Sequence, residues 1–194
     1  MAATPTNLIP PEFSGAIEDL GAMTWRREVS VEEIGSPQRI APHSLALEAE
    51  FHDDAGEDVA TGRLILLHDP AGNGAWHGTF RLVSYVRAEV DLEMVTDPLL
   101  PDVAWTWLTD ALDAHAADHH SLAGTVTASF GKGFGQMSDD ADRADVEVRS
   151  SWTPKGGAAG WLIGHLRAWQ DLLGHVAGHP PLPAGIVAFP GTRS

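Results

Sequence analysis

Four side chains that could perform acid–base chemistry lie close together in the chain, around one predicted turn. They are His68, Asp69, His77 and Arg81. A histidine beside a carboxylate can act as a general base, and an arginine can hold an anion. A small metal-independent enzyme that uses this set is therefore one hypothesis. Adjacent strand residues point to opposite faces, however, so we favour structural roles, with Asp69 capping the turn and His68 forming a hydrogen bond.

A second group of polar residues could bind an anionic ligand or a partner. Arg81, Tyr85 and Arg87 alternate along one face of a predicted strand, and Arg63 lies on the strand before it. Several carboxylates are expected on the same face, namely Glu48, Glu50, Glu89 and Asp91. Opposite charges on neighbouring strands pair with one another, and we favour such ion pairs over a ligand pocket.

Two histidines have the spacing of a metal-binding pair. His115 and His119 lie at positions i and i+4, which would place them on one helix face where they could share a zinc ion. Because the sequence fixes no third ligand, we expect adventitious metal binding at most, and no cofactor. The acidic turn at 52–58 lacks the spacing of a calcium loop, and we predict a solvated hairpin tip there.

Two of the seven tryptophans fall outside the apolar stripes of their predicted helices. Trp105 and Trp161 would form a surface for a partner or ligand if both were exposed near each other. They complete the set of candidate binding residues.

The elements that must position these residues follow from the spacing of apolar side chains. Helical spacing predicts three helices, at 12–23, 102–117 and 158–177. Alternation or short apolar runs predict strands at 26–33, 45–52, 64–67, 76–89, 122–130 and 146–152. The hairpin Thr61–Glu93, with its turn at 68–74, is the centre of this pattern.

These elements predict an α+β fold. We expect a single two-layer domain in which helices pack on an antiparallel sheet of five to six strands, in the order α-β(3–4)-α-β(2)-α. The domain would cover 12–177, between a flexible N-terminal segment at 1–11 and a proline-rich C-terminal tail at 178–194.

Composition excludes several classes of protein. The 194 residues include no cysteine, so disulfides, thiolate metal sites and thiol nucleophiles are ruled out. The net charge is −15 with only two lysines, Lys132 and Lys155, which argues against nucleic-acid binding. No apolar run reaches the roughly 20 residues of a membrane span, and no targeting segment is evident. We therefore expect a cytoplasmic protein with no nucleic-acid or membrane partner.

Several segments together resemble an actinobacterial family known as domain of unknown function 3000. The segments include Arg39–Pro42, Gly62–Gly72, Trp76–Val83, Asp97–Pro101 and Ser151–Pro154. The resemblance extends from Phe13 to Pro181 and implies a single domain, an actinobacterial source and a cytoplasmic location. It supplies no catalytic residues.

The order of elements is also similar to the secretion-chaperone-like fold, a likeness of topology alone. Our leading hypothesis is a non-catalytic binding or adaptor domain that contacts a protein partner or a small ligand through one face of its sheet. The alternatives are the hairpin enzyme described above and a chaperone-like assembly factor, which would be a homodimer.

Overall fold

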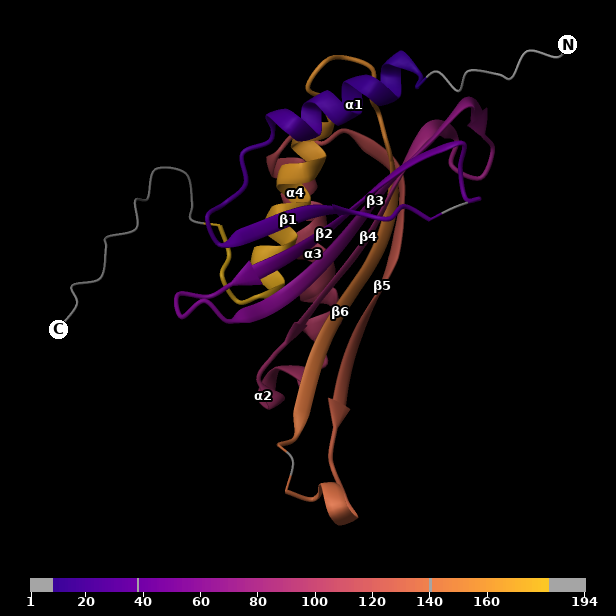
Figure 1. Ribbon diagram of the computed structural model, residues 1–194. Helices are drawn as coiled ribbons and strands as arrows, with labels where there is room; N and C mark the ends of the chain where they lie inside the picture. Colours follow the sequence, from indigo (N-terminus) through magenta and orange to yellow (C-terminus); the bar gives the residue numbers. More distant parts are fainter. Residues whose placement is uncertain (1–8, 38, 140, 182–194) are drawn as a thin grey trace, which may run out of the picture.

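A six-stranded antiparallel sheet, covered on one face by helices, forms the body of the protein (Figure 1). The computed structural model describes residues 9–37, 39–139 and 141–181. The strands, in the spatial order β1-β2-β3-β4-β6-β5, are β1 (Val29–Ile34), β2 (His43–His52), β3 (Asp58–Asn73), β4 (Gly78–Glu89), β5 (His119–Gly131) and β6 (Arg143–Pro154). The helices are α1 (Pro11–Ala22), α2 (Leu92–Val95), α3 (Leu100–Ala114) and α4 (Trp161–Val176), with a 3-10 turn, η1 (Gly135–Met137). The predicted α+β class and antiparallel sheet are confirmed.

Alternation along the strands builds the core on the helix-covered face. Leu47 and Phe51 of β2, Leu82 of β4, and Val148 and Trp152 of β6 are all buried there. The intervening residues face the opposite side, as the period-2 pattern requires, and no helix among the described residues covers that side.

Helix α4 is the centre of the helical layer. It packs against α1, α3, β3 and β4. Its predicted apolar stripe is fully buried and consists of Leu162, Leu166, Trp169, Leu173 and Val176. The close approach to β3 depends on Gly62, since a Cβ there would lie 3.0 Å from the Trp169 ring. Burial of this stripe is the main hydrophobic contribution that holds α4 on the sheet.

The N-terminus of α4 is capped by a residue from α1. The backbone N–H groups of Gly160 and Leu162 donate to the two carboxylate oxygens of Asp19, at 2.8 and 3.0 Å. Gly160, the residue at the cap position, makes no side-chain cap of its own. Asp19 therefore satisfies donors that the helix leaves open, and it lies favourably at the positive end of the helix dipole.

Several predicted boundaries are wrong. Strand β3 continues through the predicted turn at 68–74 to Asn73, with an irregularity in its pairing after His68, and the true turn lies at 74–77. Helix α3 covers Leu100–Ala114 instead of the predicted 102–117, and α2 was not predicted.

The ends of the chain are described only in part. Residues 1–8 and 182–194 of the predicted flexible segments lie outside the described residues, while Pro11 already begins α1. The start of the predicted tail is attached to the body, because Arg26 donates to the carbonyl oxygen of His179 at 3.1 Å. None of the helices among the described residues has the length and apolarity to cross a membrane.

Candidate functional site

His68 lies inside the core rather than in an open site. It projects from β3 toward the helices, is 0% exposed, and stacks between Phe13 and Phe80 with centroid distances of 5.8 and 4.2 Å. Its Nδ1 lies 3.2 Å from the carbonyl oxygen of Thr79, so that nitrogen carries the proton and donates. Burial lowers the pKa of His68 and favours the neutral ring.

The other three members of the hairpin set do not converge on His68. The carboxylate of Asp69 accepts the backbone N–H of Ala71 at 3.0 Å, a turn-type contact. His77 is exposed in the turn at a positive φ of 55°. Arg81 projects from the uncovered face of the sheet, opposite to the face of His68. The geometry of a general base beside an anion-binding arginine is therefore not formed.

Arg81 instead joins three strands. Its guanidinium donates to the carbonyl oxygen of Ser121 at 2.9 Å, to Thr153 Oγ1 at 3.0 Å and to Ser151 Oγ at 2.6 Å. Burial lowers the pKa of Arg81 from its ordinary value. These contacts hold β4, β6 and the start of β5 together.

Three further arginines of the uncovered face are paired with the protein's own carboxylates. The pairs are Arg63 with Glu48 at 2.6 Å, Arg87 with Asp145 at 2.8 Å, and Arg149 with Glu147 at 2.6 Å. The hydroxyl of Tyr85 donates to Glu147 at 3.0 Å, and burial raises the pKa of Tyr85. The hydrogen bond from Arg149 lowers the pKa of Glu147. This face is open, but four of its arginines are already engaged by groups of the protein itself.

The two off-stripe tryptophans do not share a surface. Trp105 is half-buried over β5, where a Cβ on Gly124 would lie 2.7 Å from its ring. Trp161 is half-buried at the start of α4, with its ring centroid 5.0 Å from that of Phe80. Each contributes to packing at a different strand.

The predicted histidine pair is also separated, because α3 ends before it. His115 Nε2 lies 2.6 Å from the carboxylate of Asp171 on α4. His119 belongs to β5, and its Nδ1 donates to the carbonyl oxygen of Ala117 at 2.9 Å. The i, i+4 relation on one helix face is therefore wrong.

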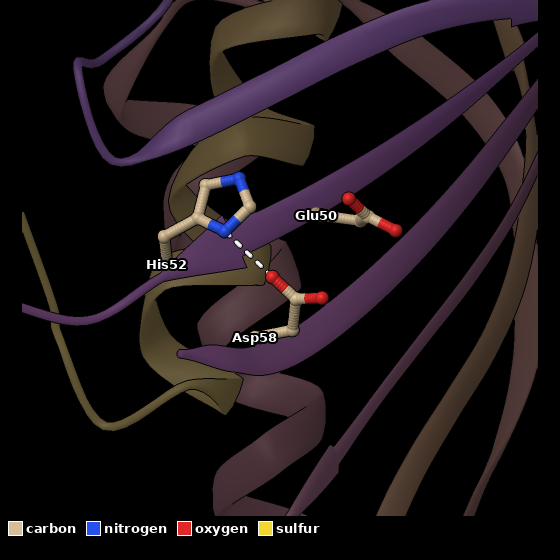
Figure 2. Close-up of side chains that lie close together, drawn as sticks. All are labelled: Glu50, His52 and Asp58. Carbon is tan, nitrogen blue, oxygen red and sulfur yellow. Dashed lines mark hydrogen bonds and ion pairs between the residues drawn. The ribbon is translucent and has the colours of Figure 1, made fainter. Parts of the chain in front are cut away.

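A different group brings possible metal ligands together at the end of the β2–β3 hairpin. Figure 2 shows Glu50, His52 and Asp58, whose ligand atoms all lie within 4.8 Å of one another. His52 Nδ1 is 2.7 Å from Asp58, and His52 Nε2 is 3.0 Å from Ser30 Oγ. Both ring nitrogens are thus engaged, so the group is explained as a surface hydrogen-bond cluster. Alternation along β2 and the pairing of His52 with Asp58 were the signals that could have located it.

A hollow lies between the start of α1, the start of β4 and the loop 155–160. Its volume is ≈530 Å³, and Phe80 and Trp161 form its aromatic walls. Glu12 and Lys155 contribute charges of opposite sign to its lining. It is large enough for a small organic molecule.

The most distinctive surface is an apolar one, at the end of the molecule that holds α2, the start of α3 and the far end of the β5–β6 hairpin. In Figure 1 this hairpin extends well beyond the helical layer, with η1 at its tip. Seven large apolar side chains there are 38–76% exposed: Leu92, Met94, Leu99, Val103, Phe130, Phe134 and Met137. We call these seven residues the apolar end. Sequence periodicity missed them because their exposure depends on where the hairpin lies relative to α3.

The fold defines the class of the protein, which is an antiparallel α+β domain. Among its described residues the predicted acid–base set does not come together, and seven large apolar side chains are exposed at one end. Comparison with models of protein families identifies the family. Residues 9–187 match the model of a family described as a protein of unknown function, DUF3000, and the chain belongs to that family. No curated protein and no solved structure matches the chain.

Proposed function

We propose that this protein is a non-catalytic binding domain and that the apolar end is its contact surface for another protein. The observation that supports the proposal is the gathering of exposed apolar side chains. Of the ten large apolar side chains exposed among the described residues, seven belong to the apolar end. Exposed apolar side chains gathered at one end of a protein are typical of an interaction site.

The length of the β5–β6 hairpin explains why these apolar side chains are exposed. Phe130 shares the helix-facing side of β5 with Val126 and Ala128, which are half-buried. Helix α2 lies against β5 and β6, and the hairpin continues past it (Figure 1). The inner face of the hairpin is therefore extended beyond the helices that would cover it. We call the space between the inner face of the hairpin, α2 and the start of α3 the corner. A partner that enters the corner would bury Phe130 together with α2 and the start of α3.

The proposal moves the contact surface away from the uncovered face of the sheet. There, Arg63, Arg87 and Arg149 already form ion pairs, so a ligand would have to displace an internal carboxylate from each. Exposed pairs of this kind contribute little to stability, but they leave these three arginines less available to a ligand. The hairpin enzyme is disfavoured because His68 and Arg81 point to opposite faces.

Photocrosslinking in the cell of origin tests the proposal. A photoreactive amino acid at Leu99 or Phe134 should give a discrete adduct with another protein, identified by mass spectrometry. The same probe at Ile40, which is 56% exposed but outside the apolar end, is the matched control. The substitution Met137→Ser should reduce the adduct formed from position 99. Equal adducts from Ile40 and Leu99, or none from either apolar-end position, would contradict the proposal.

A further inference from the structure

A long stretch of the chain that contributes to the apolar end carries acidic residues and no basic ones. Between Arg87 and Lys132 the sequence contains eight Asp or Glu residues and neither Lys nor Arg. This single segment forms α2, α3 and β5. It carries about half of the net charge of −15 in less than a quarter of the chain.

Four of these carboxylates lie in α2, in the residues that flank it or in the first turn of α3: Asp91, Glu93, Asp97 and Asp102. All four are exposed. Only Asp97 has a fixed partner among the described residues, since it accepts the backbone N–H of Leu99 at 2.9 Å. On the uncovered sheet face, by contrast, Glu48, Asp145 and Glu147 are each paired with an arginine. The acids at the apolar end are available to an outside cation.

We infer that the apolar end binds a basic amphipathic segment of another protein, one in which Lys or Arg flanks the apolar side chains that enter the corner. This inference rests on the proposed function and names the chemistry of its partner. Apolar anchors supply the affinity of such a complex, and the unpaired carboxylates supply its orientation and association rate.

The same charges disfavour other occupants. A second copy of this chain would bring two acidic surfaces together, which opposes an isologous dimer through the apolar end. Nucleic acid and anionic lipid surfaces would be repelled. The chain itself does not supply the segment, since Arg26 and Arg27 are the only two adjacent basic residues in it.

Two synthetic peptides provide the test. Both are amphipathic helices of about five turns with the same leucine face, but one has lysines and the other glutamates on the polar face. Fluorescence anisotropy with the full chain should show saturable binding of the lysine peptide and none of the glutamate peptide. The affinity for the lysine peptide should fall at least tenfold between 50 and 500 mM NaCl, where the Debye length shortens from about 14 to about 4 Å.

Two four-site variants separate the local charge from the global one. The variant D91N/E93Q/D97N/D102N neutralises the acids beside the apolar end, keeps an acceptor oxygen at position 97, and should weaken binding of the lysine peptide at least tenfold. The control E18Q/E32Q/E33Q/E57Q removes the same four charges elsewhere, all at exposed positions, and should leave binding within twofold. Circular dichroism and thermal unfolding establish that both variants are folded.

Each contrary result has a definite meaning. Equal weakening in both variants would show a global charge effect and overturn the inference. Tight binding of the glutamate peptide, or failure of both peptides to bind, would also overturn the inference. The proposed function would still hold in these cases if the photoreactive amino acid at Leu99 gave a partner-specific crosslink. Unchanged binding of the lysine peptide by the variant L99S/F134S would also overturn the inference, because Leu99 and Phe134 would then contribute nothing to the affinity.

Discussion

At the scale of single residues, the polar side chains with the most defined surroundings hold elements together. His165 on α4 is 1% exposed, and its Nδ1 accepts the indole N–H of Trp152 at 3.1 Å. Asp19 caps α4 from α1, and Arg81 joins three strands. These residues connect parts of the chain that are distant in sequence, so their loss should be measured as stability rather than activity.

The buried ring of His165 should make stability depend on pH. Burial lowers the pKa of His165 from 6.5 to about 4. The unfolded chain therefore binds more protons between these pH values, and the stability contributed by the neutral ring is complete above pH 6.5 and lost as the pH falls toward 4. At about 1.4 kcal/mol per pKa unit, the loss is on the order of 3 kcal/mol.

Urea unfolding of wild type and H165Q at pH 7 and pH 4.5 measures this effect. Glutamine retains an acceptor for Trp152 but does not titrate, so the variant should lose distinctly less stability at pH 4.5. His68 and His175, whose pKa values burial also lowers, remain in both proteins. An identical pH dependence in the two proteins would show that His165 does not contribute.

The cap on α4 gives a second prediction at this scale. Asp19→Ala leaves the N–H groups of Gly160 and Leu162 without their acceptor and should lower the free energy of unfolding by about 1–2 kcal/mol. Asp19→Asn keeps one acceptor oxygen and should cost less. Chemical denaturation of the three proteins provides the comparison, with Glu18→Ala, exposed on the same helix, as the control. A cost for D19A no larger than that for E18A would contradict the capping role.

At the scale of elements, alternation and helical stripes were sufficient to predict the sheet and the buried face of α4. The positions of turns were not. Asp-Pro-Ala-Gly at 69–72 has turn chemistry, yet β3 accommodates it as an irregularity and continues, because the buried run that ends at His68 is held by pairing with both neighbours. The short helix α2 has too few residues for a periodic signal.

The candidate site was less predictable than the fold. Strand alternation did indicate that His68 and Asp69 need not meet. The apolar end did not, because Leu99 and Phe130 have the same types and spacing as core residues, and only the three-dimensional position of the hairpin leaves them exposed.

The β5–β6 hairpin gives a prediction for a whole element. Phe134 and Met137 at its tip are 76% and 61% exposed, so the tip contributes little to the core. Replacing residues 132–142 with a two-residue Asn-Gly turn should change the free energy of unfolding by less than about 1 kcal/mol. The same variant should lose the crosslink from position 99. A large loss of stability would show that the tip packs on the body.

At the scale of the whole molecule, a net charge of −15 lowers the stability of the folded state. Like charges repel within the folded protein, and salt screens this repulsion. We expect the midpoint of thermal unfolding to rise between 50 and 500 mM NaCl. The four-site control variant E18Q/E32Q/E33Q/E57Q should show a smaller rise, since it has less repulsion to screen. A midpoint that falls with salt would mean that surface ion pairs such as Arg63–Glu48 outweigh the repulsion.

The late position of α4 in the chain has a consequence for biosynthesis. The sheet strands that it covers are translated long before it: about 100 residues separate the end of β3 from the end of α4, or roughly 5–20 s of elongation. Throughout that interval the leucines of β2 and β3 lack the cover of α4, and exposed apolar surface makes a nascent chain prone to aggregate. A chain truncated before Trp161 should accordingly bind a hydrophobic dye such as ANS and precipitate, and a chain truncated there that remains monodisperse would show that the sheet can form without its helix.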